Sequence, residues 1–466
     1  MRTLSGHGKH GGLGAVVVGG GPAGAGLLLA ARGAGLLDAL LDLPIRIVER
    51  DDAVGAGELG RYAIRSDSNA ESFFRAVETP GEPSLSLALE TSAGQDVLRR
   101  RGAPIALSAA AAFLAGTFEE LRGALAASGR DPFLTGLDAV AARRSAAGGW
   151  RVRCRDTRTG EEAAFDAGTL VLATGAHQPR ERLLREAVAG APLLPRFEGK
   201  VVQSSALLSA GQAGASLLAR LAALDSPRVA IVGASHSAVA CARLLLDAAP
   251  AGLRFGEGAV SVLHRQPLRL TYASEAAALE DGYTDFGPGD VCARTGRVFP
   301  LAGFRNDARD LLRRAWGLGG CGPEPRLRLH RLQPGPDSEA ERILEDADLV
   351  VAAFGYRPRA LPLFDAGGSR IPLAAEAGVS PLVDDRSRVL AAGGAPLESV
   401  FGIGLAAGFP LCGTHGEESF EGQANGLSLW HGEIGAAIAR EILSAAPGRK
   451  GARTLPLAVR LSAGGG

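Results

Sequence analysis

The sequence has few of the residues that would mark several common kinds of protein. Among its 466 residues are five scattered cysteines, Cys154, Cys241, Cys292, Cys321 and Cys412. No two of them are close enough for a CxxC pair, which excludes a neighbouring-dithiol redox mechanism and the commonest zinc knuckles. The eight histidines show no ligand spacing either. We therefore expect no metal site, and the free thiols are typical of a reducing cytoplasm.

An excess of charge and a membrane-spanning segment are also lacking. Lys+Arg and Asp+Glu number 50 each, so the net charge is zero. This argues against a nucleic-acid partner, because such proteins need a basic face. The apolar stretch 13–31 contains three successive glycines and a proline, which favour a strand, a turn and a helix over a membrane span. Residues 1–14 have no hydrophobic signal core, so we expect no membrane association.

Glycine is abundant, and a glycine-rich turn follows the first strand-like segment. A β-branched run at 15–18 predicts a buried parallel strand, and an apolar segment to about Arg32 predicts a helix. The sequence between them, GGGPAG, satisfies GxGxxG. In such a turn the first glycine permits the bend, the second lets a diphosphate approach the backbone, and the third lets the helix pack closely. The candidate cofactor contacts here are Gly19, Gly21, Pro22, Ala23 and Gly24.

Two further segments complete this first nucleotide-binding pattern. A strand-like run at 45–48 ends in Glu49 and Arg50, and a carboxylate at that place accepts the ribose hydroxyls of an adenosine. A buried strand at 169–172 ends in Ala-Thr-Gly. Such small residues let the chain pass closely beneath a bound dinucleotide, so Thr174 and Gly175 are candidate contacts as well.

A second turn of the same kind lies in the middle of the chain. The strand-like run 228–232 is followed by GASHSA and a helix-like segment to 247. Small residues stand where two glycines are usual, and the serine hydroxyls are additional phosphate donors. The candidate contacts are Gly233, Ser235, His236, Ser237 and Ala238. After the next strand, at 260–263, Arg265 stands near the place of the acid. This favours NADPH over NADH, because a guanidinium pairs with a 2′-phosphate; the alternative is a solvated surface charge.

These segments resemble the two-dinucleotide-binding-domain flavoproteins, in which such motifs bracket FAD. A run at 347–358 resembles their ATGY-x-P strand end, and a strand at 399–404 is expected to bring Gly404 to the flavin, although the Asp common after it is missing. The resemblance implies an α/β fold with two Rossmann-like domains, the NADPH domain inserted in the FAD domain. The expected boundaries are 1–222 and 357–448 for FAD, 223–356 for NAD(P)H with an insertion at about 271–327, and 449–466 for a flexible tail.

The linker before the second turn narrows the resemblance. Residues 197–205, FEGKVVQSS, resemble the FxGxxxHS linker of class B flavin monooxygenases, with Gln203 in place of the histidine. A glutamine can position a nicotinamide by hydrogen bonds but cannot titrate. An ordinary linker strand is the alternative. In the stretch 57–68, expected to run under the flavin, Arg61 and Asp67 are candidates for a polar pair, or else are surface charges.

The resemblance implies a reaction in which NADPH reduces FAD and oxygen adds at flavin C4a. The resulting hydroperoxide passes one oxygen atom to an amine nitrogen, a sulfur or a carbonyl of a small-molecule substrate, and N-hydroxylases are the nearest subgroup. An NAD(P)H-dependent flavin dehydrogenase or reductase without oxygen transfer is the main alternative, and a nucleotide-binding redox sensor is another. The insertion either shapes a substrate pocket or mediates a homo-oligomer, and the sequence does not choose between these.

Overall fold

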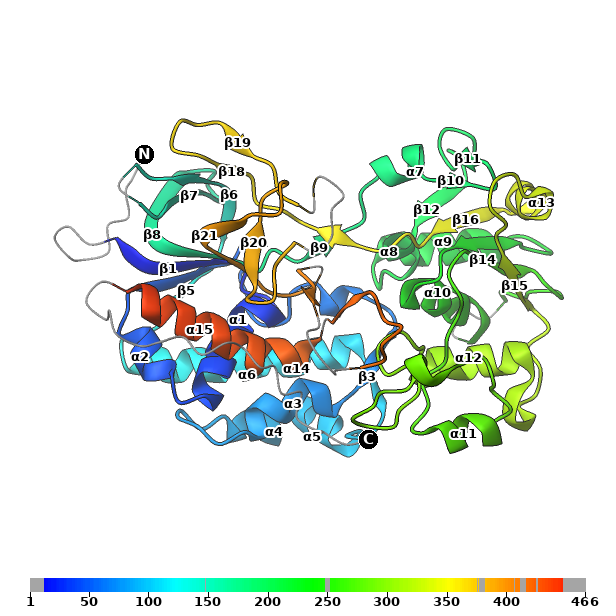
Figure 1. The fold of residues 1–466 in the computed structure, drawn as a ribbon, viewed down its shortest axis with the longest axis horizontal. Coiled ribbons are helices and arrows are strands. Elements are labelled where there is room, and N and C mark those ends of the chain that lie inside the picture. The colour runs from blue at the N-terminus through cyan, green and yellow to red at the C-terminus, as the bar shows by residue number, and fades with distance from the viewer. Residues whose placement is uncertain are drawn as a thin grey trace.

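Two sheets lie side by side in the computed structural model, each covered by helices (Figure 1). The model describes residues 12–146, 148–247, 252–374, 376, 382–405, 407–410, 416–424 and 426–446. The predicted tail at 449–466 is outside these residues. None of the helices in the described ranges combines the length and the apolar character that crossing a bilayer requires.

The first sheet is built around β1 (Leu13–Val18), which pairs in parallel with β2 (Ile45–Val48) and β8 (Glu162–Leu172). The four β1 residues 15–18 are almost completely buried, as the β-branched run predicts. On the far side of β8 a meander extends the sheet. The remaining strands of the first sheet are β5 (Phe133–Leu134), β6 (Leu137–Arg144), β7 (Trp150–Asp156), β18 (Leu363–Phe364), β19 (Arg370–Ile371), β20 (Arg388–Leu390) and β21 (Pro396–Gly402).

In the view of Figure 1, helices cover the first sheet from below, and α1 (Pro22–Gly33) directly follows the glycine turn. It packs along α15 (Glu433–Ala445), whose buried face includes Ile434, Ile438 and Ile442. The other helices are α2 (Leu37–Leu41), α3 (Glu71–Glu78), α4 (Ser86–Glu90), α5 (Ser92–Arg99), α6 (Leu107–Ala127) and α14 (Leu427–Trp430).

The second sheet has five parallel strands in the order β12-β16-β13-β14-β15. They are β12 (Val201–Gln203), β13 (Val229–Val232), β14 (Val260–His264), β15 (Leu327–Arg331) and β16 (Leu349–Ala352). Its helices are α8 (Ser204–Leu207), α9 (Gln212–Ala222), α10 (His236–Asp247) and α13 (Ser338–Asp346). All five strands come from the part of the chain between β8 and β18 of the first sheet. This order agrees with the predicted arrangement, and the exact domain boundaries stay predictions.

The two chain segments that join the sheets run together. Strand β9 (Ala176–His177) leaves the first sheet and pairs with β17 (Arg357–Pro358), which returns from the second (Figure 1). The predicted α/β class, with two units each built around parallel strands, is therefore confirmed.

The segment between β14 and β15 is long, as predicted, and it folds beneath the second sheet. It contains α11 (Glu275–Glu280) and α12 (Asn306–Trp316), and its aromatic residues join the core of the second sheet. Helix α12 packs on α10 and also on β3 (Arg65–Asn69), which pairs with β4 (Pro104–Ala106) beside the first sheet (Figure 1). The predicted insertion thus contacts both halves of the molecule.

Candidate functional site

The first glycine turn has no room for side chains at two of its glycines. Gly19 has φ +105°, and a Cβ there would lie 2.4 Å from the carbonyl oxygen of Ala173. A Cβ on Gly24 would lie 1.8 Å from the oxygen of Gly19. The turn is therefore held tightly between the end of β8 and the start of α1, and this fits the reasons given for its glycines.

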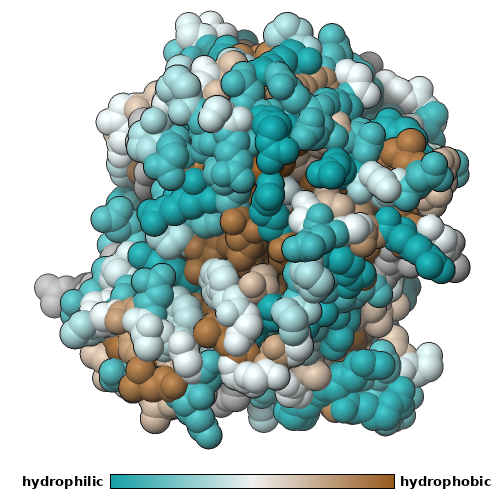
Figure 2. Space-filling view, turned by 90° about the vertical axis from the view of Figure 1, so that its right-hand side faces the viewer, coloured by the Kyte–Doolittle hydropathy of each residue, from teal (hydrophilic) through white to brown (hydrophobic). Residues whose placement is uncertain are grey.

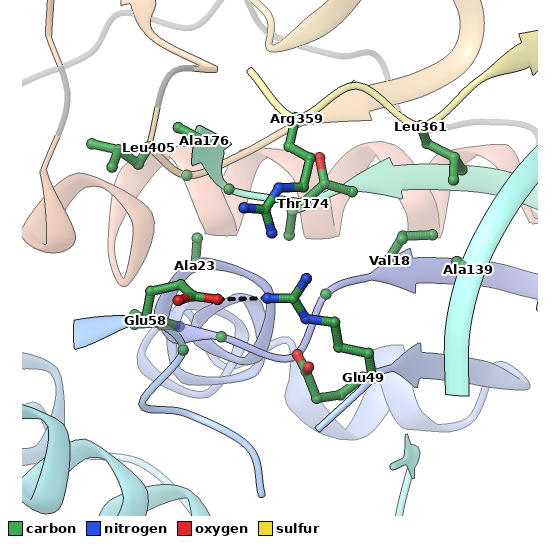
Figure 3. A pocket seen from close by; sticks show the side chains of 18 of the residues that line it. Val18, Ala23, Glu49, Glu58, Ala139, Thr174, Ala176, Arg359, Leu361 and Leu405 are labelled. Atoms are coloured by element: carbon green, nitrogen blue, oxygen red, sulfur yellow. Dashed lines mark hydrogen bonds and ion pairs between the residues drawn. The ribbon is translucent and has the colours of Figure 1, made fainter. Parts of the chain in front are cut away.

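A cavity extends from this turn toward the two segments that join the sheets (Figure 3). Seven predicted contacts line it on the side of the turn and of β2: Gly19, Gly21, Pro22, Ala23, Glu49, Arg50 and Thr174. Gly175 and Gly404 line it as well, and Gly24 lies behind the turn. Most of the residues that the sequence assigned to one cofactor are thus brought together around one cavity.

The acid after β2 is fixed by backbone donors. One carboxylate oxygen of Glu49 accepts from the amide of Gly20 at 2.6 Å, and the other accepts from the amide of Asp51 at 2.9 Å. Arg50 turns away to pair with Glu58 at 2.5 Å across the cavity wall (Figure 3). Glu49 is therefore oriented before any ligand arrives.

Three residues that sequence reasoning missed also line this cavity. The guanidinium of Arg359 projects into it, and the backbone amide of Arg359 donates to Gly175 (Figure 3). The hydroxyls of Tyr62 and Tyr356 lie 3.0 Å apart, and burial raises the pKa of Tyr356, so this phenol stays neutral. The run ending at Pro358 was a signal for Tyr356 and Arg359, but nothing in the sequence pairs residues 62 and 356.

The second turn repeats the backbone of the first. Gly233 has φ +145°, and a Cβ there would lie 2.3 Å from the oxygen of Ala353, at the end of the adjacent strand. The hydroxyl of Ser235 donates to that same oxygen at 3.2 Å, so this hydroxyl is already engaged and is not free to donate to a phosphate. Ser237 and the buried Ala238 lie in the first turn of α10, directly after His236.

His236 is directed away from the turn, contrary to the expectation of a phosphate contact. Its ring lies against that of Phe304, tilted by 45° with the centroids 4.7 Å apart, and its Nε2 lies 3.9 Å from a carboxylate oxygen of Asp67. The cause is the segment between β14 and β15, which places Phe304 against the start of α10.

Arg265 follows β14 at the edge of the sheet where the second turn lies. Its guanidinium donates to the carbonyl of Ala187, and it lines a cavity together with Arg331, which ends β15. The residue is exposed, but its side chain is anchored at a cavity and is not simply solvated. Sequence reasoning missed Arg331, because its strand, β15, follows an insertion whose length hides the βαβ spacing.

The three catalytic candidates do not form one group. The predicted pair of Arg61 and Asp67 is wrong: Arg61 lies 3.1 Å from Glu58 and 3.8 Å from Asp51. The reason is that Tyr62 pairs with Ser209, after which β3 carries Asp67 away to α12. Gln203 ends β12, beside Ala352 of β16, and precedes Ser204, whose hydroxyl accepts from Gln178 at 2.7 Å.

Comparison with known proteins gives the chain its relatives. No family model matches it. It is 31% identical over 434 residues to the CMP-5'-(3-aminopropyl)phosphonate hydroxylase of Streptomyces rubellomurinus, covering 92% of this chain and 97% of that protein.

Solved structures with a similar fold include two monooxygenases. One is the FAD-bound cadaverine monooxygenase of Erwinia amylovora, with a TM-score of 0.55 and 14% identity over 93% of this chain and 95% of that one. The other is the ornithine N-hydroxylase of Kutzneria sp. 744 with reduced FAD, NADP⁺ and L-ornithine. Its TM-score is 0.52, with 16% identity over 93% and 99% of the two chains. The chain therefore belongs to the family of the CMP-5'-(3-aminopropyl)phosphonate hydroxylase, and it shares its fold with these two solved enzymes.

Proposed function

We propose that this enzyme uses FAD and NADPH to transfer one oxygen atom to the nitrogen of a primary amine. The oxygen acceptors that the sequence implies are amines, sulfur and carbonyl carbons, and the relatives favour amines. The similar hydroxylase is named for an aminopropyl phosphonate, and the solved neighbours act on cadaverine or hold ornithine. Each of these molecules carries a primary amine.

The cavity at the first turn has the features that FAD requires. Glu49 is held by two amides at the end where an adenosine ribose would lie. The start of α1 and the Arg359 guanidinium offer positive charge to a diphosphate. Tyr62, Tyr356 and Leu405 line the cavity beyond the turn, where we place the flavin ring.

The second turn and its two arginines suit NADPH. Gly233 opens the start of α10 to a diphosphate, and Arg265 and Arg331 line a cavity at the ends of the two following strands. This is where the 2′-phosphate of NADPH lies in a Rossmann unit, and two guanidiniums favour it over the free hydroxyl of NADH.

One observation carries the proposal: the cavity at the first glycine turn is also lined by the segment that returns from the second unit. The glycine turn of the first unit lines it, and so do Tyr356 and Arg359, which follow the last strand of the second unit. Bound FAD supplies hydride acceptance and oxygen activation. The chain orients the ring and holds the neutral phenol of Tyr356 beside it, hydrogen-bonded to the hydroxyl of Tyr62, while Gln203 can position the nicotinamide without exchanging protons.

The test is a coupled assay with ¹⁸O₂. The FAD-loaded enzyme is supplied with NADPH and 3-aminopropylphosphonate, free or linked to CMP, and the amine is analysed by mass spectrometry. We expect one ¹⁸O atom in the amine product for most of the NADPH consumed. If the electrons from NADPH appear only as hydrogen peroxide and no amine gains oxygen, the reductase alternative is correct and this proposal is wrong.

A further inference from the structure

The cavity at the ends of β14 and β15 has two walls outside the second glycine turn. One wall is the hairpin of β10 (Ala187–Val188) and β11 (Ala191–Pro192), and the other is the loop that follows β15. The two walls approach each other closely, since a Cβ on Gly190 would lie 3.5 Å from Cα of Pro336. The hairpin and α13 lie together at the upper right of Figure 1. Figure 2 views this end of the molecule, and the upper part of its surface is mostly hydrophilic.

The two arginines at this cavity are held in different ways. Arg265 donates to the carbonyl of Ala187 in the hairpin, so its side chain is anchored. Arg331 also lines the cavity, but within the described ranges its guanidinium makes no hydrogen bond or ion pair. This guanidinium is therefore available to an anion, and its place depends on the backbone that carries it.

The backbone around Arg331 is tied to α13 by a buried carboxylate. Asp337 is 7% exposed and precedes the first residue of α13. Its Oδ1 accepts from the amide of Ala340 in α13 at 3.0 Å. Its Oδ2 accepts from the amide of Gln333 in the loop at 3.1 Å and from Nε2 of His330 in β15 at 2.8 Å. One side chain thus joins the end of β15, the loop after it and the start of α13.

The three donors also keep this carboxylate charged. Burial raises the pKa of Asp337, but the hydrogen bonds from Ala340, His330 and Gln333 lower it more, to about 2. A carboxylate only accepts hydrogen bonds, so Nε2 of His330 carries a proton and donates it. The Nδ1 of the same ring lies 3.8 Å from the exposed carboxylate of Glu339. The bond between His330 and Asp337 is therefore charge-assisted, which makes it one of the stronger kinds.

A helix cap accounts for only one of these bonds. The contact of Oδ1 with Ala340 is an ordinary N-cap, which a serine provides as well. The two bonds of Oδ2 point instead to residues on either side of Arg331, since His330 precedes it and Gln333 follows it. The side chain of Gln333 also donates to the carbonyl of Arg331 at 3.4 Å. The Oδ2 bonds thus act on the segment that carries Arg331.

We propose that Asp337 and His330 are positioning residues for NADPH, which together hold Arg331 where it meets the 2′-phosphate. This rests on the proposed function, which places that phosphate in the cavity, and adds the residues behind the contact. Both side chains lie behind the loop rather than among the residues that line the cavity. Losing the Oδ2 bonds lets the loop and Arg331 move. The cost falls on the 2′-phosphate, because NADH has no phosphate there.

The test measures nucleotide binding to the FAD-loaded full-length enzyme by calorimetry. Adenosine 2′,5′-bisphosphate is the probe, and adenosine 5′-monophosphate is the same molecule without the 2′-phosphate. Asp337→Ser keeps a cap for Ala340 but lacks the second oxygen. We expect it to weaken binding of the bisphosphate about threefold to tenfold, at most the effect of losing one charged hydrogen bond. Binding of the monophosphate should not change.

His330 offers a second pair of variants that leaves the cap in place. His330→Gln supplies an amide donor near the position of Nε2 and should bind the bisphosphate nearly as well as the wild type. His330→Leu supplies none and should weaken binding as Asp337→Ser does. Ser274→Ala is the matched control, because Ser274 caps α11, far from α13, by accepting from Ala277 at 3.2 Å (Figure 1). It should lower stability and change neither affinity.

Three results would overturn this inference and leave the proposed function standing. The first is equal affinity of Asp337→Ser and the wild type for the bisphosphate. The second is an equal loss for both probes, which would mean that the variant only disturbs the fold. The third is equal weakening in His330→Gln and His330→Leu. If Asp337→Ser does not fold, the two His330 variants decide. A wild type that binds both probes equally would instead refute the NADPH assignment of the proposed function, and this inference with it.

Discussion

The two glycine turns have nearly the same backbone but different surroundings. Gly19 and Gly233 both press against the carbonyl of the residue that ends a neighbouring strand, at 2.4 and 2.3 Å from a Cβ if one were present. The two turns differ at the position five residues after these glycines. Gly24 has no space for a Cβ, whereas Ala238 holds the equivalent place, fully buried.

The residues after the second strand of each unit differ in charge as well. Glu49 is held by two backbone amides, and Arg265 lies with Arg331 beside a cavity. A carboxylate accepts ribose hydroxyls and repels a phosphate, while guanidiniums attract one. The comparison teaches that one strand–turn–helix pattern can serve two dinucleotides, with the residue at the next strand end selecting between them.

The largest effect is expected from closing the space at the first turn. Gly24→Ala would place a Cβ 1.8 Å from the oxygen of Gly19, so the turn must move. We expect loss of bound FAD and destabilisation by more than about 3 kcal/mol. Flavin absorbance of the purified protein and its thermal unfolding measure this.

Ala238→Gly is the matched control, since the second turn has room there, and it should cost about 1 kcal/mol or less. If Gly24→Ala retained FAD as well as Ala238→Gly does, the two turns would not differ as described.

We expect the stability of the protein to depend on pH through His431, which supports the first turn. The Nε2 of His431 donates to the carbonyl of Pro22 at 2.8 Å, and burial lowers the pKa of His431 to about 4. Between pH 6.5 and 4 the unfolded chain binds a proton that the folded chain does not, so stability falls as the pH falls, by up to roughly 3 kcal/mol.

Urea unfolding at several pH values tests the role of His431. We expect His431→Gln to be less stable at pH 7 but to lose less stability on acidification than the wild type. Equal pH slopes in the two proteins would mean that His431 is not the titrating group.

A smaller effect is expected at the second turn. Arg265→Ala should raise the KM for NADPH about tenfold, the effect of losing a charged hydrogen bond, and change that for NADH little. Arg331→Ala should act in the same direction. Steady-state kinetics with both nucleotides test this, and equal changes for NADPH and NADH would remove the 2′-phosphate from this cavity.

The sequence predicted the local patterns well and the long-range contacts poorly. Both turns, their strands and the acid at Glu49 follow from spacing along a short stretch, because one βαβ unit folds locally. Three features depend on how distant segments meet: the pair of Tyr62 and Tyr356, the entry of Arg359 into the cavity, and the presence of Arg265 and Arg331 at one cavity. The periodicity of the sequence carries no information about such contacts between distant segments.

The wrong predictions have a similar cause. Arg61 and Asp67 are near each other in sequence, but the pairing of Tyr62 with Ser209 separates them. His236 lies in the turn motif, yet the insertion draws its ring to Phe304. The insertion was recognised by its length alone, and its contacts with β3 could not be predicted because they join segments more than 200 residues apart.

The most direct test of the central claim is reduction of the bound flavin without oxygen. The FAD-loaded enzyme is mixed anaerobically with NADPH or NADH in a stopped-flow instrument, and the absorbance of oxidised flavin is followed. We predict complete bleaching, faster with NADPH than with NADH. A protein that is colourless and takes up no added FAD, or one whose flavin stays oxidised with both nucleotides, would contradict the account.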